Sequence, residues 1–177
     1  SPIKINMVVM RSVNLASIVP MAKHFRESGH IIRFIEYMDV GDSNGWRLDE
    51  VVPSSEIVEL IGAQLPLEPI APNYVGEVAS RWKYTDGSGE IGLISSVSQP
   101  FCGDCSRLRL SARGELFTCL FASSGHDVRT LLRGDASDEK IVDTVASLWK
   151  NRDDRYSELR SEQTQQIPRV EMSYIGG

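Results

Sequence analysis

The sequence lacks the features that mark several large classes of protein. Only three cysteines occur in 177 residues, and an odd number cannot pair completely within one chain, so a disulfide-stabilised secreted domain is not indicated. No apolar run approaches the roughly 18 to 20 residues of a membrane-spanning helix. The net charge of −5 lacks the basic excess of a general nucleic-acid binder. We therefore expect a cytoplasmic protein that binds neither membranes nor nucleic acid.

Glycine-rich phosphate loops are also missing, since neither a P-loop nor a G-x-G-x-x-G pattern occurs. A bound nucleotide would therefore be held by side chains. What is present is ordinary for a soluble globular protein, with 41% apolar and 24% charged residues. The chain opens on Ser1-Pro2 and passes at once into an apolar stretch, so we expect it to be a piece of a longer protein.

The first forty residues predict a strand, a helix and a second strand, over residues 3–10, 18–28 and 31–38. This βα unit favours a parallel sheet. In the first strand Lys4 and Asn6 lie on the face opposite the apolar residues, which is typical of an edge strand. In the second strand Arg33 and Glu36 interrupt an apolar run. They either pair with each other or point into a site at the end of the strand.

The rest of the chain predicts a different organisation. A polar loop, 39–48, follows the second strand, and loops in this position carry ligands in α/β folds. A short helix to about residue 61 would be capped by Ser54 or Ser55. Three prolines in 65–73 indicate a boundary between a βα portion, 1–72, and a portion with antiparallel strands, 73–177. The latter contains a hairpin of strands 75–84 and 90–97, an amphipathic helix over 136–150 and a charged segment, 151–166, with ion pairs.

All three cysteines lie in one stretch with the spacing C-x2-C-x13-C. We interpret this stretch as a second hairpin that turns at 111–114. If Leu110 pairs with Glu115, Cys119 returns opposite Ser106, and the sulfurs of Cys102, Cys105 and Cys119 converge at the open end. This register would account for the gap of 13 residues.

Three soft ligands are consistent with either Zn²⁺ or an iron–sulfur cluster. A structural zinc needs a fourth ligand, for which His126 is the nearest histidine in sequence. A four-iron cluster on three cysteines would leave one iron open to a substrate. Arg107 and Arg109 share a strand face beside these cysteines, and paired guanidinium groups suit phosphate oxygens.

Five segments of the chain together resemble the GTP 3′,8-cyclase family of molybdenum cofactor biosynthesis, in the radical S-adenosylmethionine (SAM) superfamily. They are KINMVVM, RFIEYMDVGDSNGWRLDEVVP, GLISSVSQPFCGDCSRLRLSARGELFTCLF, WKNRDDRYSE and MSYIGG. The resemblance covers the C-terminal half of that family. It implies an α/β chain in which the last part of an incomplete TIM-type barrel precedes a small α+β domain with antiparallel strands and a [4Fe–4S] cluster.

The resemblance also implies roles for particular residues. Cys102, Cys105 and Cys119 would hold the cluster, whose open iron binds the guanine. GTP would be bound by Lys4, Arg33, Arg107 and Arg109, and SAM would be contacted by Met38. Gly176 and Gly177 match the double-glycine tail that the chemistry requires, so with Arg33 they are the expected catalytic residues. The expected partners are GTP, SAM and the N-terminal half of the same enzyme, with a second copy of the chain as a further candidate.

The departure from the family is the absence of its C-x3-C-x2-C motif, which holds a second [4Fe–4S] cluster and generates the radical from SAM. The resemblance implies that the full-length parent converts GTP to (8S)-3′,8-cyclo-7,8-dihydroguanosine 5′-triphosphate, the first step of the pathway. The isolated chain is expected to be inactive. Two alternatives stay open. One is a non-catalytic, zinc-stabilised module that binds anions, and the other is a natural remnant that works beside a separate radical SAM subunit.

Overall fold

The computed structural model describes residues 2–160 and 168–175, which belong to two compact units. The first unit comprises Ser1–Met38 and Trp46–Cys105. The second comprises Asp39–Gly45 and Ser106–Gly177. The division between the units therefore does not fall at the expected boundary of 72/73, which lies inside the first unit.

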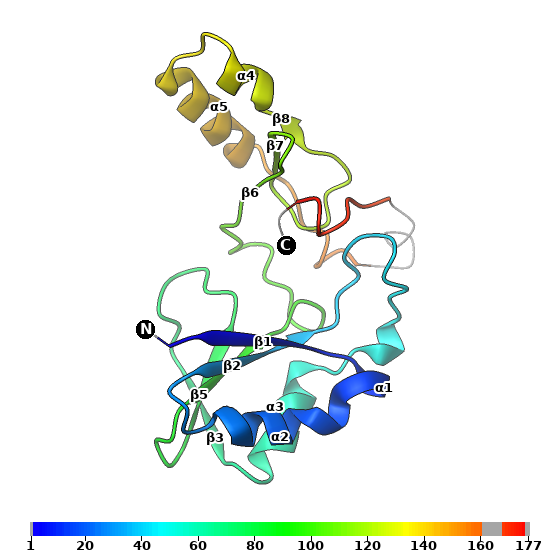
Figure 1. The fold of residues 1–177 in the computed structure, drawn as a ribbon, viewed down its shortest axis with the longest axis vertical. Coiled ribbons are helices and arrows are strands. Elements are labelled where there is room, and N and C mark those ends of the chain that lie inside the picture. Colours follow the sequence, from blue (N-terminus) through cyan, green and yellow to red (C-terminus); the bar gives the residue numbers. More distant parts are fainter. Residues whose placement is uncertain (1, 161–167, 176–177) are drawn as a thin grey trace. The chain divides into compact units, whose positions relative to one another are not determined.

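The first unit is built on a mixed five-stranded sheet (Figure 1). The strand order is β1-β2-β5-β4-β3, with β1, β2 and β5 parallel and the other two neighbouring pairs antiparallel. The prolines of 65–73 do not separate domains, because Leu67 to Ile70 form the last strand of this sheet. The predicted βα unit, the hairpin and the edge position of the first strand are confirmed. The strands are β1 (Lys4–Val9), β2 (Ile31–Glu36), β3 (Leu67–Ile70), β4 (Ser80–Tyr84) and β5 (Glu90–Ile94).

Helices in the first unit connect these strands. They are α1 (Arg11–Asn14), α2 (Ile18–Phe25) and α3 (Ser54–Gly62), with 3₁₀ helices at Leu15–Ser17 and Leu48–Glu50. The predicted α2 is confirmed, and Gly29 follows it at φ 73°. Residues 11–14, between the predicted first strand and helix, form the short helix α1. The Asn14 side chain closes that turn, since its Oδ1 accepts from the Met10 amide at 2.8 Å and its Nδ2 donates to the Val8 carbonyl at 2.9 Å.

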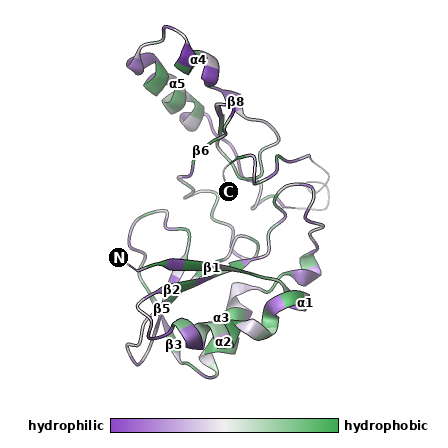
Figure 2. Ribbon diagram, viewed as in Figure 1, coloured by the Kyte–Doolittle hydropathy of each residue, from purple (hydrophilic) through white to green (hydrophobic). Residues whose placement is uncertain are grey.

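Alternate residues of the strands form the core with α2 and α3. Ile32 and Phe34 of β2 are at most 1% exposed, as are Ile18 of α2 and Ile57 of α3. Full burial of each such side chain contributes about 1.5–3 kcal/mol. Figure 2 shows hydrophobic residues along these strands and helices. The opposite side chains of β1 and β2, which include Lys4 and Arg33, consequently lie on the other face of the sheet.

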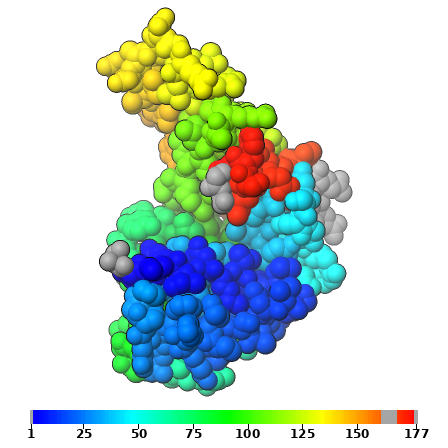
Figure 3. Space-filling view, in the orientation of Figure 1, coloured from blue at the N-terminus to red at the C-terminus, as the bar shows by residue number. Residues whose placement is uncertain are grey.

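In its described residues, the second unit contains a small antiparallel sheet of order β6-β7-β8 and two helices. The amphipathic helix is confirmed, and the Ser137 hydroxyl caps it by accepting from the Lys140 amide. The C-terminal segment, red in Figure 3, packs within this unit against the loop 39–45. The elements are β6 (Arg109–Leu110), β7 (Glu115–Phe117), β8 (His126–Asp127), α4 (Arg129–Arg133) and α5 (Asp138–Lys150).

The expected register of the cysteine hairpin is wrong by one residue. Leu110 pairs with Leu116 rather than Glu115, and Arg109 pairs with Phe117. The Gly114 amide donates to the Ser111 carbonyl at 3.0 Å, and the Ser111 amide donates to the Glu115 carbonyl at 2.9 Å. Gly114 at φ 79° completes a three-residue loop with a bulge, which adds one residue to the returning strand.

No helix in the described part of the chain has the length and apolar character required to cross a bilayer.

Candidate functional site

A pocket of about 450 Å³ lies on the face of the sheet opposite α2 and α3. We call it the sheet pocket. It brings together Lys4 of β1 and Arg33 of β2, which are far apart in sequence. Arg33 is fixed by donating from Nε to Asn6 Oδ1 at 2.8 Å, across a register pair of the two strands. The residues that line the sheet pocket are Pro2, Lys4, Ile31, Arg33, Asn73, Glu77, Ala79, Arg81, Glu90, Ile91 and Gly92.

Gly92 makes room in the pocket for the Arg33 side chain. The two residues are register partners of β5 and β2. A Cβ atom on Gly92 would lie 2.9 Å from Arg33 Cγ and 3.3 Å from Ala79 Cβ. Because carbon atoms do not approach so closely without displacement, any larger residue here would push the Arg33 stem.

Arg81 is a third cation of the pocket that sequence reasoning missed. It is also a register partner of Gly92, from the side of β4. Its Nη2 donates to Glu90 at 2.5 Å, and its Nη1 donates to Asn73 Oδ1 at 2.9 Å and to the Ala71 carbonyl at 3.0 Å. Three of its five donors are thereby used for positioning. The pairing of β2, β5 and β4 that brings it beside Arg33 joins segments distant in sequence.

The lining of the pocket favours an anionic ligand. Lys4, Arg33 and Arg81 provide three positive charges, and Glu77 and Glu90 provide two negative charges, which leaves one positive charge in excess. Burial alone would raise the pKa of Glu77, but hydrogen bonds from Asn73 and the charges of Arg81 and Lys4 lower it overall. Glu77 therefore stays ionised in the pocket at neutral pH.

Met38 is half-buried and lies two residues after Glu36, the last residue of β2. The Glu36 carboxylate is held in place by several hydrogen bonds. Glu36 is 0% exposed. Its Oε1 accepts from the Ser54 amide at 2.8 Å and its Oε2 from the amides of Val97 and Ser98 at 2.8 Å each. The expected capping of α3 by a serine side chain is therefore wrong, since a carboxylate from the sheet receives the first helical amide.

The alternative in which Arg33 and Glu36 pair is also wrong. They are three positions apart in one strand, so they lie on opposite faces of the sheet. Arg33 lines the sheet pocket, whereas Glu36 faces α3. Arg33 lines a pocket, but it does so from the third residue of β2 and not from the end of the strand, where the other alternative expected the site.

The cysteines are distributed between the two units. Cys102 and Cys105 lie in the first unit on a turn in which the Cys105 amide donates to the Cys102 carbonyl at 3.3 Å. Cys119 lies in the second unit, where the Phe121 amide donates to its Sγ at 3.4 Å. All three are partly exposed. Within residues 2–160 and 168–175, no group of three or more His, Cys, Asp or Glu side chains is placed to hold a metal ion.

The donor set nevertheless fits the chemistry of an iron–sulfur cluster. Thiolates are its normal ligands, and a backbone amide directed at a ligand sulfur, as at Cys119, is a usual feature of such sites. His126, the candidate fourth ligand for zinc, is exposed in β8 and pairs in register with Leu116.

Arg107 and Arg109 lie in the second unit and alternate with exposed leucines. Both arginines are half-buried, whereas Leu108 and Leu110 are 39% and 56% exposed. This alternation agrees with the predicted shared face of the arginines, although only Arg109 belongs to a strand. It reverses the usual pattern of apolar residues inside and charged residues outside. Gly176 and Gly177 lie outside the described residues.

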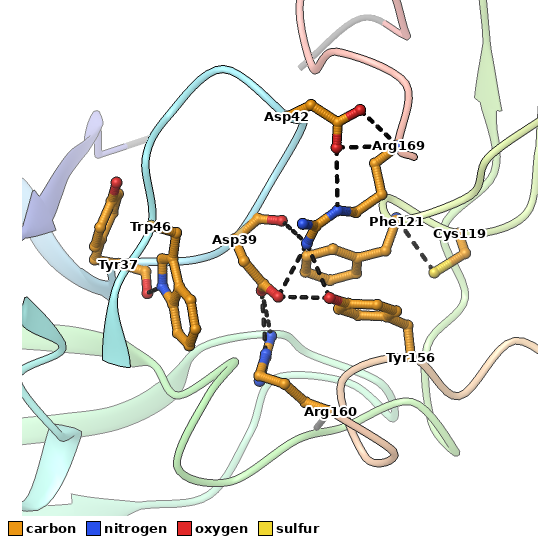
Figure 4. A network of polar contacts seen from close by, with 9 residues as sticks. All are labelled: Tyr37, Asp39, Asp42, Trp46, Cys119, Phe121, Tyr156, Arg160 and Arg169. Atoms are coloured by element: carbon orange, nitrogen blue, oxygen red, sulfur yellow. Dashed lines mark hydrogen bonds and ion pairs between the residues drawn. The ribbon is translucent and has the colours of Figure 1, made fainter. Parts of the chain in front are cut away.

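The charged segment 151–166 was predicted to form ion pairs, but the buried ionic network that it forms in the second unit with Asp39 was not predicted (Figure 4). Asp39 is 1% exposed and accepts from Tyr156 Oη at 2.6 Å and from Arg160 Nε at 3.1 Å. Arg169 Nη1 lies 3.0 Å from the same carboxylate. Tyr156 stacks on Phe121 with ring centroids 4.5 Å apart. The network thus connects a loop that follows β2 with residues more than a hundred positions later.

Comparison with known proteins gives relatives over nearly the whole chain. A GTP 3′,8-cyclase of Acidothermus cellulolyticus is 47% identical over 201 residues, covering 99% of this chain and 56% of that protein. One of Xanthomonas campestris pv. campestris strain B100 is 49% identical over 175 residues, covering 99% and 51%. The chain therefore spans about half the length of these curated relatives.

The family model described as Molybdenum Cofactor Synthesis C matches residues 30–158. This range contains Arg33, Met38, the three cysteines and both arginines of the R-x-R pair. The expected resemblance is confirmed, and the chain belongs to the Molybdenum Cofactor Synthesis C family of the GTP 3′,8-cyclases.

Proposed function

We propose that this chain is the part of a GTP 3′,8-cyclase that binds GTP and a [4Fe–4S] cluster. The observation that carries the proposal is the sheet pocket, in which Lys4 and Arg33 line one positively charged cavity. Both were expected to bind GTP, and they come from neighbouring strands. In this proposal the parallel strands β1, β2 and β5 are the last strands of a partial TIM-type barrel, and the N-terminal part of the enzyme supplies the remainder.

Each cation has a role that follows from its geometry. Lys4 contributes an exposed ammonium group that can follow a flexible phosphate chain. Arg33 is held by Asn6, so it offers its remaining donors to the ligand in a fixed orientation and is the expected catalytic residue of the pocket. Arg107 and Arg109 would bind further phosphate oxygens through bidentate contacts.

Cys102, Cys105 and Cys119 would hold the cluster, and Met38 would contact SAM. When bound, a cluster on three cysteines supplies one iron without a protein ligand, which can accept a nitrogen or oxygen atom of the guanine base. The residues of this chain bind and orient GTP for cyclisation to (8S)-3′,8-cyclo-7,8-dihydroguanosine 5′-triphosphate. The radical would arise at SAM and a second cluster in the other half of the enzyme. Gly176 and Gly177 would approach the same active site.

The proposal is tested by GTP binding to the chain after anaerobic reconstitution with iron and sulfide. We expect about four iron atoms per chain. Calorimetry should show that Lys4→Ala and Arg33→Ala each weaken GTP binding about tenfold to a hundredfold, because each removes a charge-assisted hydrogen bond. Lys23→Ala is the matched control, since Lys23 lies on α2 and binds Gln64 instead.

Stoichiometric zinc in anaerobically purified protein, with no cluster obtainable, would overturn the assignment. Loss of that zinc in His126→Ala, with no effect of GTP, would favour the anion-binding module instead.

A further inference from the structure

The C-terminal segment 168–175 is attached to the second unit by three separate anchors, none of which the proposed function uses. The first anchor is Arg169, which is 7% exposed at its side chain. Its guanidinium group contacts the Asp39 carboxylate at 3.0 Å and also donates to Tyr156 Oη at 2.8 Å. Its backbone amide donates to Asp42 Oδ2 at 3.1 Å. The segment is therefore fixed at its start to both acidic residues of the loop 39–45.

The second anchor is Glu171, which is received by backbone amides of the same loop. Its Oε1 accepts from the Asp42 amide at 3.0 Å and from the Ser43 amide at 3.1 Å. The loop can turn around this carboxylate because Gly41 adopts φ 68°. A Cβ atom at Gly41 would lie 2.3 Å from Glu171 Oε2, so the loop is shaped to the acidic side chain.

The third anchor is Tyr174. Its hydroxyl donates to Glu115 Oε2 at 2.5 Å, and its ring lies edge-on to Phe117 at 6.3 Å between centroids. The hydrogen bond to Glu115 raises the pKa of Tyr174, so its hydroxyl stays a donor. The next residue, Ile175, is 1% exposed. The segment is thus anchored near its end as well, at Tyr174 and Ile175.

The anchored segment ends at Ile175, which directly precedes the Gly176-Gly177 pair in the sequence. The loop 39–45 starts directly after Met38, the expected SAM contact. Arg33 of the sheet pocket lies five residues before Met38, so these three features follow one another along the chain.

We propose that the loop 39–45 is a positioning element that sets the placement of the C-terminal segment through Asp39, Asp42 and its amides around Glu171. The effect of this loop on catalysis rests on the proposed function, because that function gives Gly176 and Gly177, which follow the segment, a role in the reaction. The attachment of the segment to the loop does not rest on that function. Asp39 and Glu171 act through the segment and are positioning residues.

The test compares Glu171→Ala, which removes the acceptor, with Glu171→Gln, whose amide oxygen can still accept both backbone hydrogen bonds. Glu158→Gln is the matched control, because Glu158 pairs with Arg155, three residues before it in the same unit. Hydrogen–deuterium exchange of the 177-residue chain is followed in peptides covering 168–177 and, in the same unit, helix α5 at 138–150. Exchange in 168–177 should become about tenfold faster in Glu171→Ala, because two hydrogen bonds to a charged acceptor are lost.

Glu171→Gln and Glu158→Gln should exchange like the unmodified chain, and exchange in 138–150 should be unchanged in every variant. Unchanged exchange in Glu171→Ala would overturn the proposal. So would equal acceleration in 138–150, since that result describes general destabilisation of the unit.

The catalytic part is tested in full-length enzyme that carries this sequence and both clusters. Glu171→Ala should lower kcat about tenfold with KM for GTP unchanged, and Glu171→Gln should restore kcat. Altered exchange with unchanged kcat would overturn positioning as a catalytic role. Failure of the chain to bind GTP, with exchange altered as expected, would contradict only the proposed function.

Discussion

Gly92 shows how one residue without a side chain controls the shape of the sheet pocket. It sits between two arginines, being the register partner of Arg33 on one side and of Arg81 on the other. The space that a Cβ would occupy already contains the Arg33 stem. The position of that guanidinium group therefore depends on a neighbouring strand as much as on its own.

Replacement of Gly92 by alanine should displace Arg33 and weaken GTP binding about tenfold, with a loss of about 1–3 kcal/mol of folding free energy from overpacking. Calorimetry with GTP and urea unfolding measure the two effects. Gly62→Ala is the control, because nothing lies within 4 Å of a Cβ atom at that position of α3. Unchanged GTP affinity in Gly92→Ala would show that the pocket does not depend on this contact.

Residue patterns predicted some of these positions and missed others for physical reasons. Alternation within β1 was sufficient to place Lys4 and Asn6 on one face. The same rule shows that Arg33 and Glu36 cannot share a face, so their suggested pairing neglected information in the sequence. Arg81 is different, because its place beside Arg33 depends on β5 pairing with both β2 and β4. No local pattern contains that pairing.

The loop 39–45 is an element whose structure depends on an ionised side chain. Burial would raise the pKa of Asp39, but hydrogen bonds from Tyr156 and Arg160 and the charge of Arg160 lower it overall. Arg169 and Asp42 complete the charged surroundings. Because the pKa is lower in the folded chain, the unfolded chain binds more protons in acid. The stabilisation is therefore present above about pH 4 and is lost as pH falls through the folded pKa.

Urea unfolding between pH 7 and pH 3 should reveal this dependence. At pH 7 we expect Asp39→Asn to be less stable by about 3 kcal/mol, because two buried guanidinium groups lose their carboxylate. The difference between this variant and the unmodified chain should shrink as pH falls. Asp143→Asn, at an exposed position of α5, should follow the unmodified chain. A difference that stays constant down to pH 3 would contradict a role for the ionised form.

The β6–β7 hairpin shows the limit of prediction for a whole element. Its existence and its turn residues were predicted from sequence, but its register was wrong. Pairing Leu110 with Glu115 assumed a turn without a bulge, whereas Gly114 at φ 79° places Leu110 opposite Leu116. Because the turn type decides the register of every later pair, a glycine in the left-handed conformation changes the expected partner of Cys119 as well.

For the whole molecule, the number of cysteines limits the chemistry. All three belong to one motif, and the C-x3-C-x2-C pattern of radical SAM enzymes does not occur in the sequence. The chain spans about half the length of its relatives and retains the residues proposed to bind GTP. Substrate binding and radical generation are thus expected to be separable properties.

The isolated chain, reconstituted and supplied with SAM, GTP and dithionite, should form no 5′-deoxyadenosine and no cyclised nucleotide, while it still binds GTP. Anaerobic incubation followed by chromatography measures both products. The GTP 3′,8-cyclase of Acidothermus cellulolyticus serves as the positive control under the same conditions. Formation of either product by the isolated chain would refute this division of labour.

The seven residues Asp39–Gly45 have a consequence for any attempt to divide the protein. They leave the first unit after Met38 and return to it at Trp46, where Trp46 Nε1 donates to the Tyr37 carbonyl at 2.8 Å. The chain therefore crosses between the units at three places. A gene fragment that encodes 106–177 alone would bury Arg160 and Arg169 without Asp39. One that encodes 1–105 would retain a loop without the arginines that it binds. The two units can be distinguished by their contacts, but a single cut cannot separate them into two intact proteins.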